Sequence, residues 1–230
     1  MQIVDTPQNF IEGIFVKELK NRFLCEVIID GVSTICYVPS SCHLSNFLSL
    51  EGKQVLLVPT QTLGSRTPYS LFAVPYKRNY IILNTSMANR AIENSIHSRR
   101  FYFLGERKIV IKEHMIEGYK ADLFLPETNT IFEIKSIIST KHCANFPSVY
   151  SERTLQQLDA IRNLLLQNHR VCLAIVSLHP YLKSINIDNG TAFHTKLVKC
   201  LDAGLILKAY TSRLHYYKAI IDKEIPIELQ

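Results

Sequence analysis

The hydrophobic residues of this chain change their periodicity near residue 78, and that change constrains the fold more than any other feature. Before it, apolar residues form short runs separated by turn residues, the pattern of β-strands. After it, helical spacing alternates with strand-like runs. With 230 residues, 47% of them hydrophobic, the chain has enough apolar surface for two modest cores. The sequence therefore predicts two architectures, over residues 1–78 and 79–230.

The first part carries five strand-like runs and a short helical turn near residues 44–48. Asp30-Gly31 is a typical two-residue hairpin turn. Five short strands with one helical turn favour a small β-barrel of the OB type, although a fragment of a β-sandwich would give a similar pattern. The predicted strands cover residues 10–18, 23–29, 33–38, 54–59 and 69–74.

The second part predicts a mixed α/β sheet between helices. Ser151 is expected to cap a helix with one apolar face, formed by Leu155, Leu158, Ile161, Leu164 and Leu165. The all-apolar run 171–176 is typical of a buried central strand, and Gly204 is expected to end a later helix. The other predicted helices begin at Thr85 or Ser86 and at Thr191, and the other predicted strands cover residues 108–113, 121–125, 130–137, 205–210 and 215–221.

The composition does not favour a membrane-spanning or a disulfide-linked protein. No apolar run approaches the roughly 18 residues that a membrane helix needs, and the first residues lack the features of a signal peptide. We therefore expect a cytoplasmic protein with no membrane partner. The cysteines lie mostly in apolar runs without dense spacing, so we expect reduced core thiols and no zinc site. They are Cys25, Cys36, Cys42, Cys143, Cys172 and Cys200.

The most unusual residues are charged side chains inside two apolar strand-like runs. Asp122 interrupts the run 121–125, where burial of an unpaired carboxylate is costly. Alternation along the next predicted strand turns Glu133 and Lys135 to one face. A short turn joins the two strands, so Asp122 and Glu133 can lie side by side at the end of the sheet. Two such carboxylates repel each other unless a divalent cation lies between them.

This arrangement suits a metal-dependent phosphodiesterase. Mg²⁺ or Mn²⁺ prefers carboxylate oxygens and keeps several waters, and a metal-bound water of lowered pKa can attack a phosphodiester. Lys135 is placed to orient that water or to neutralise charge on the phosphate. The simpler alternative is that Glu133 and Lys135 form a solvent-facing ion pair while Asp122 caps a turn.

Further charged residues are weaker candidates for the same function. Glu93, on the first predicted helix of the second part, and Glu113, at the end of the strand before Asp122, are candidate metal ligands; the alternative for both is a solvated surface charge. The net charge of +6 permits a polyanionic partner. In the first part, basic residues flank strand ends beside aromatic residues, as an OB-type nucleic-acid surface requires. Among them we expect Arg22 and Arg66 to contact nucleic acid.

Several motifs resemble those of the SfsA family (sugar fermentation stimulation protein A), and the resemblance runs over nearly the whole chain. The most specific part is Glu133-Ile134-Lys135-Ser136 followed by Asn145-Phe146-Pro147 and Ser151-Glu152-Arg153, which is similar to E-V-K-S-V and F-P-D-A-V-T-E-R-G in the family. Further similar motifs are Asn21-Arg22-Phe23, Val38-Pro39-Ser40-Ser41, Ala88-Asn89-Arg90 and Ala121-Asp122-Leu123.

The resemblance implies an N-terminal OB-like β-barrel, a C-terminal PD-(D/E)xK nuclease-like α/β domain, and DNA binding. It also gives the start of the helix after Ser151 a role: free N–H groups there favour a phosphate, so Glu152 is expected to act in catalysis and Arg153, Gln156 and Gln157 to contact nucleic acid. The expected catalytic residues are Asp122, Glu133, Lys135 and Glu152, and the expected ligands of Mg²⁺ or Mn²⁺ are Asp122, Glu133, Glu93 and Glu113.

The sequence departs from the family pattern around these acids. Tyr119-Lys120 stands where the family has Ser-Arg, and Thr154, Gln156 and Gln157 replace other family residues in the helix. Retention of the three core charges favours a DNA- or RNA-cleaving enzyme. The altered neighbours keep open the alternative, a non-catalytic DNA-binding regulatory protein with a nuclease-like fold.

Overall fold

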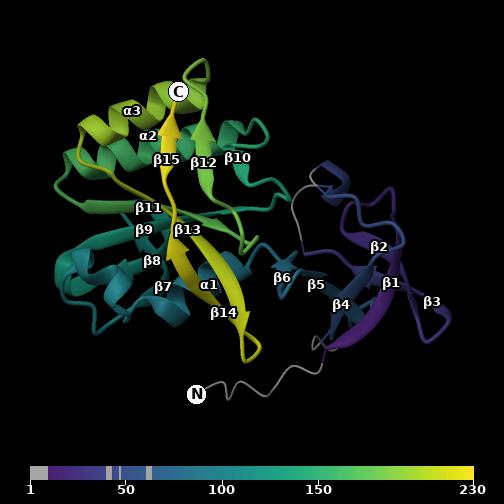
Figure 1. The fold of residues 1–230 in the computed structure, drawn as a ribbon. Coiled ribbons are helices and arrows are strands. Elements are labelled where there is room, and N and C mark those ends of the chain that lie inside the picture. Colours follow the sequence, from purple (N-terminus) through teal and green to yellow (C-terminus); the bar gives the residue numbers. More distant parts are fainter. Residues whose placement is uncertain (1–9, 40–42, 47, 61–63) are drawn as a thin grey trace.

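The computed structural model of the chain describes residues 10–39, 43–46, 48–60 and 64–230. The strands within residues 11–76 gather on one side of the molecule (Figure 1). On the other side lie the helices α2 (Glu152–Leu166) and α3 (Ala192–Asp202). Ser40 and Ser41, from one of the family-like motifs, and Cys42, one of the predicted core thiols, lie outside the described residues.

The first part is a closed five-stranded barrel, as predicted. β1 (Ile11–Glu18) pairs antiparallel with both β2 and β4, β2 pairs with β3, and β4 pairs with β5. A parallel pair between Tyr37 and Ser70 joins β3 to β5 and closes the ring. The short helix η1 (Leu44–Asn46) lies between β3 and β4, where the helical turn was predicted. The remaining strands are β2 (Leu24–Ile29), β3 (Val32–Tyr37), β4 (Gln54–Pro59) and β5 (Tyr69–Tyr76).

The β2–β3 hairpin turns at Asp30-Gly31, as predicted. Both residues are left-handed, with φ of 49° and 81°, and Ile29 pairs with Val32 across the turn. A two-residue turn of this kind matches the right-handed twist of the strands, and glycine adopts its second position without steric cost.

A sixth strand, which the sequence did not predict, follows the barrel. β6 (Asn79–Ile82) pairs antiparallel with β5, and the N–H of Ile82 donates to the carbonyl of Leu178 in the second part at 3.0 Å. Ile81 and Ile82 belong to a buried cluster that runs from the barrel into the second part. Four residues are too few to show a periodicity, so this strand could not be predicted from the sequence. The division at residue 78 stays a prediction.

The second part contains a six-stranded mixed sheet of order β14-β13-β11-β9-β8-β7. β7, β8 and β9 are antiparallel, β11 is parallel to β9, and β13 is parallel to β11, so the expected mixed α/β arrangement is present. β14 returns antiparallel to β13. The strands are β7 (Ile111–Ile116), β8 (Tyr119–Leu125), β9 (Thr130–Ile137), β11 (Arg170–Ser177), β13 (Ile206–His215) and β14 (Lys218–Glu224).

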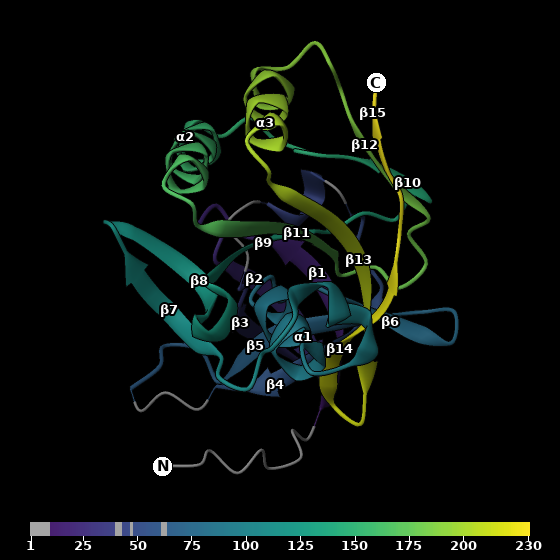
Figure 2. The same cartoon turned by 90° about the vertical axis from the view of Figure 1, so that its left-hand side faces the viewer.

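Helices cover both faces of this sheet. α1 (Met87–Ser95) contacts β14 and β9 and contributes to the cluster shared with the barrel. α2 (Glu152–Leu166) and α3 (Ala192–Asp202) lie together on the opposite face (Figure 2). Ser151 caps α2 by accepting the N–H of Thr154, and the buried residues of α2 are the predicted five. Gly204, with φ of 98°, follows the end of α3.

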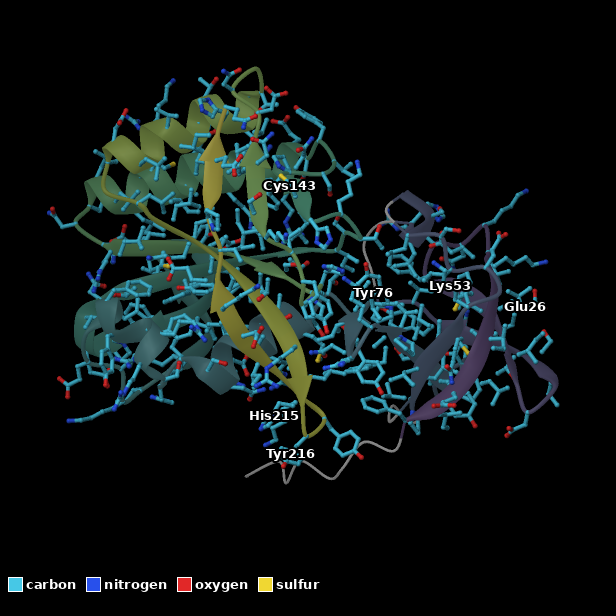
Figure 3. The ribbon with its side chains drawn as sticks, viewed as in Figure 1. Glu26, Lys53, Tyr76, Cys143, His215 and Tyr216 are labelled. Carbon is cyan, nitrogen blue, oxygen red and sulfur yellow. The ribbon has the colours of Figure 1, made fainter. Side chains whose placement is uncertain are left out.

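Two strand ends differ from the prediction because of left-handed turns. β7 extends to Ile116 because the turn into β8 lies at Glu117-Gly118, with φ of 48° and 81°. The predicted strand 215–221 contains a turn at Tyr216-Tyr217, with φ of 44° and 65°, which separates β13 from β14 (Figure 3). The elements that the sequence did not predict also include η2 (Arg99–Leu104) and a parallel three-stranded sheet of β10 (Cys143–Asn145), β12 (Ser184–Ile187) and β15 (Ile227–Leu229). η3 (Pro126–Thr128) occupies the predicted turn between β8 and β9.

Four of the five described cysteines are buried, and all five are free thiols. Cys143, labelled in Figure 3, is exposed, so the prediction of a core thiol was wrong there. Its strand β10 has three residues, and alternation turns Ala144 inward and Cys143 outward. Within the described ranges, no helix is long and apolar enough to cross a membrane.

Candidate active site

The two strands that carry Asp122 and Glu133 separate at these residues. Their ladder ends with Leu123 opposite Phe132. At the next position Asp122 Oδ2 accepts the N–H of Ile134 at 2.7 Å, so this carboxylate takes the place of a strand carbonyl. Its Oδ1 accepts a hydrogen bond of 3.0 Å from Asn89 Nδ2, on α1. The Asp122 carboxylate is therefore fixed at the point where β8 leaves β9.

Glu133 lies on the face of β9 that packs toward α2. As predicted, alternation puts it on the same face as Lys135. Ile131 and Ile137 share that face and belong to the core beneath α2 and α3. Glu133 is only 3% exposed. The Tyr119 hydroxyl donates to Oε2, and Oε1 accepts from Lys135 Nζ at 2.8 Å and from Gln157 Nε2 at 3.0 Å. A buried carboxylate is thus surrounded by donors, the condition that makes its burial tolerable.

The environment of Glu133 alters its acidity. Burial raises the pKa of its carboxyl above the ordinary value of 4.5, and the negative charge of Asp122 acts in the same direction. The positive charge of Lys135 and the hydrogen bonds from Lys135 and Tyr119 oppose that rise. Burial, followed by the nearby Glu133 carboxylate, raises the pKa of Tyr119, so its phenol stays protonated and can only donate to Glu133 at neutral pH.

These side chains border a pocket of about 400 Å³ between β8, β9 and the start of α2. Three carboxylates line it, from Glu113, Asp122 and Glu133, together with the basic Lys120, Lys135 and Arg153. Lys120 Nζ pairs with Glu113 at 2.7 Å, which lowers the pKa of that exposed acid. No three His, Cys, Asp or Glu side chains in the described part of the chain are arranged to hold an ion by themselves. A cation here would take water or substrate oxygens as its remaining ligands.

The pocket contains part of the predicted site. Besides the three core charges, it includes Glu113, Arg153 and Gln157, and Lys135 Nζ donates to Gln157 Oε1. Glu93, Glu152 and Gln156 are not among the residues that line it. Glu93 accepts hydrogen bonds from Lys112 and Arg90. Glu152 is exposed and accepts from the Tyr150 hydroxyl at 2.6 Å, and Gln156 is exposed on α2.

Arg22 and Arg66 belong to the barrel, and Arg66 lines a hollow there that is separate from the acidic pocket. Phe23 and Tyr37 also line this hollow, which has a volume of about 520 Å³. The guanidinium carbon of Arg22 lies 4.9 Å from the centroid of the Phe23 ring. The two arginines are therefore close to exposed aromatic rings and do not belong to the acidic pocket.

Sequence reasoning missed two residues of the acidic pocket's surroundings, Tyr119 and Asn89. Asn89 lies one helical turn before Glu93, in a family-like motif, and this was the signal for it. A tyrosine at a buried strand position needs a partner for its hydroxyl, which was the signal for Tyr119. Neither signal identifies the partner, because Asn89 and Asp122 are 33 residues apart in the chain.

Two family models match the chain. The model described as "SfsA N-terminal OB domain" matches residues 19–83, which include most of the barrel and β6. The model described as "Sugar fermentation stimulation protein RE domain" matches residues 86–217, which include the acidic pocket.

Known relatives match over almost their whole length. A sugar fermentation stimulation protein homolog of Natranaerobius thermophilus is 24% identical over 90% of this chain and 89% of its own, and one of Caldanaerobacter subterraneus subsp. tengcongensis is 27% identical over 91% and 92%. The solved structure of Pyrococcus furiosus SfsA in complex with Ca²⁺ superimposes with a TM-score of 0.81, covers 96% of both chains, and is 18% identical. The fold is thus that of a solved relative, and with the match to the family models we conclude that the chain belongs to the sugar fermentation stimulation protein (SfsA) family.

Proposed function

We propose that this chain is a metal-dependent phosphodiesterase that cleaves nucleic acid. One observation carries the proposal: a single pocket of about 400 Å³ gathers three carboxylates and three basic side chains at the split between β8 and β9. A hard divalent cation needs carboxylate oxygens, and a phosphodiester needs positive charge around its non-bridging oxygens. The pocket offers both kinds of group within one small volume.

The donors of the pocket fit Mg²⁺ or Mn²⁺, and Asp122 and Glu133 would hold the ion. Each Asp122 oxygen accepts one described hydrogen bond, and a carboxylate oxygen can accept two, so Asp122 retains capacity for a cation. When bound, the ion would supply a water of lowered pKa. Support comes from the Pyrococcus furiosus relative, whose structure was solved in complex with Ca²⁺, because Ca²⁺ also prefers oxygen ligands.

The other side chains have separate tasks. Lys135 Nζ, held between Glu133 and Gln157, is placed to orient a water or to neutralise charge on the reacting phosphate. Arg153 lies in the first turn of α2 and lines the pocket. Free N–H groups at a helix start favour an anion, so Arg153 would bind the phosphate of the substrate there. Glu113, on the neighbouring strand β7, lines the same pocket and is the candidate for a further ligand.

One observation favours a second function, nucleic-acid binding without cleavage. Glu133 already accepts hydrogen bonds from Tyr119, Lys135 and Gln157. Burial also raises its pKa, which disfavours the charged form that binds metal. A regulatory DNA-binding protein could retain such a satisfied site for stability alone.

A cleavage assay distinguishes the two functions. Labelled single- and double-stranded DNA and RNA would be incubated with the chain and Mg²⁺, Mn²⁺ or EDTA, beside the variants Glu133→Ala and Lys135→Ala. Lys199→Ala, on the exposed surface of α3, is the matched control. The proposal expects metal-dependent cleavage by the wild type and the control and its loss in both site variants. Salt-dependent binding without cleavage in any metal would refute the enzyme and leave the binding protein.

A further inference from the structure

The hollow beside Arg66 lies on the barrel and shares no lining residue with the acidic pocket. It is formed where the β1–β2 turn (Asn21 and Phe23), the strand β3 (Ile35 and Tyr37) and the segment before β5 (Arg66) come together, and it measures about 520 Å³. In barrels of the OB type, strands and loops of this kind form a surface on which extended ligands can lie.

Two aromatic rings are exposed in this hollow. Phe23 is 36% exposed and Tyr37 is 40% exposed. Their ring centroids are 6.4 Å apart and their planes differ by only 16°, so the rings present roughly parallel faces. A folded chain gains by burying aromatic surface, so two neighbouring rings left open to solvent on one face suggest a ligand with flat apolar groups.

The charged residue among those described as lining the hollow is basic, and a second basic residue contacts one of the rings. Arg66 lines the hollow, and Arg22 lies over the face of Phe23. The described residues that line the hollow include no aspartate or glutamate. A ligand that suits this surface therefore carries negative charge together with flat rings. Nucleic acid combines the two, because its bases stack on aromatic side chains while its phosphates pair with arginine.

We propose that this hollow binds unpaired bases, so that the chain engages single-stranded nucleic acid or a single-stranded segment of a longer substrate. The inference rests on the proposed function in that nucleic acid is the substrate. A base can stack on Phe23 or Tyr37 only when its own face is free. In a duplex, each base face is covered by the neighbouring base pair. The barrel thereby selects single-stranded over duplex nucleic acid, and the acidic pocket cleaves the bound strand.

Binding in EDTA tests this inference without any cleavage. The probes are fluorescent oligothymidylate and oligouridylate of about 16 nucleotides, the upper site size of one OB fold, and a DNA duplex of the same length, titrated by anisotropy. We expect tighter binding of both single strands than of the duplex. Tyr37→Ala should weaken single-strand binding by roughly 5- to 150-fold, the range for loss of one stacked base. Tyr37→Phe, which keeps the ring, should bind as the wild type does.

Two further variants separate stacking from general effects. Tyr102→Ala removes an exposed tyrosine on η2, outside the hollow, and should leave binding unchanged. Arg66→Gln should reduce the slope of log affinity against log salt by about 0.7 for a single strand, the share of one phosphate contact. Equal binding of duplex and single strand, or undiminished binding by Tyr37→Ala, overturns the inference. Absence of any nucleic-acid binding also overturns it and leaves the hollow to another occupant, such as an apolar peptide. Because no metal is present, none of these results depends on whether the acidic pocket cuts.

Discussion

Tyr119→Phe would show whether the Tyr119 hydroxyl holds Glu133 in place. In the wild type this hydroxyl donates to Glu133 Oε2, whereas Lys135 and Gln157 both donate to Oε1. The substitution therefore removes the described donor to Oε2 inside a site that is nearly closed to water. Phenylalanine keeps the ring and its packing, so the change isolates the hydrogen bond.

The expected loss of stability follows from the charge and burial of Glu133. A hydrogen bond to a charged group contributes about 1.5–3 kcal/mol, and water cannot readily replace this donor because Glu133 is 3% exposed. For a chain of this size, 1 kcal/mol corresponds to about 2–4 °C in Tm, so Tm should fall by about 3–12 °C.

The loss should depend on pH. Glu133 has a folded-state pKa above its ordinary value of 4.5. The stability that it contributes is therefore fully present below pH 4.5 and is lost as pH rises through the folded-state pKa. Loss of the Tyr119 donor raises the folded pKa further. The difference between wild type and variant should therefore be smallest below pH 4.5 and should grow as pH rises through the folded-state pKa of Glu133.

Calorimetry and urea unfolding at several pH values measure this difference. The control is Tyr150→Phe, because the Tyr150 hydroxyl also donates to a glutamate, Glu152, at 2.6 Å but is on the surface. That change should cost less than about 0.5 kcal/mol. Equal effects of the two substitutions, or an unchanged Tm for Tyr119→Phe, would refute the role assigned to the buried hydrogen bond.

Three further outcomes are expected. Asn89→Ala frees Asp122 Oδ1 from its donor and should weaken Mn²⁺ binding by about 10- to 100-fold in calorimetric titration, as loss of a partner that orients a metal ligand does; unchanged affinity would contradict the role of Asn89. Leu158→Ala, in the core under α2, should cost about 2–5 kcal/mol in urea unfolding, whereas Leu166→Ala, 60% exposed, should cost less than about 0.5 kcal/mol. In native protein a thiol reagent should modify exposed Cys143 much faster than the four buried described cysteines, so Cys143→Ser should remove a fast-reacting fraction.

The sequence was sufficient for those parts of the fold in which periodicity is strict. The apolar face of α2, from Leu155 to Leu165, was predicted residue by residue because five apolar side chains repeat at helical spacing. The same alternation put Glu133 and Lys135 on one face of β9. That this face packs toward α2 is a result of the structure. Asp30-Gly31 was informative because that turn needs residues that tolerate positive φ.

Features that depend on tertiary contacts gave no such signal. The turn at Tyr216-Tyr217 uses two bulky residues in left-handed conformations, which no turn preference predicts. The separation of β8 from β9 at Asp122 is a property of the ladder, and only that separation frees the N–H of Ile134 for the carboxylate. The ion pairs of Glu93 also depend on tertiary contacts. Its helix position made it a candidate metal ligand, but in the structure its carboxylate pairs with Lys112 and Arg90.

Equilibrium binding of Mn²⁺ to the full chain, measured by calorimetric titration and by electron paramagnetic resonance, tests directly whether Asp122 and Glu133 hold a metal ion. Binding at the pocket should require both acids, so Asp122→Asn and Glu133→Gln should each abolish it. Asp159→Asn, on the exposed face of α2 and paired there with Lys196, should bind as the wild type does. Wild-type affinity in either site variant, or no binding of Mn²⁺ by the wild type, would contradict the claim that Asp122 and Glu133 form a metal site.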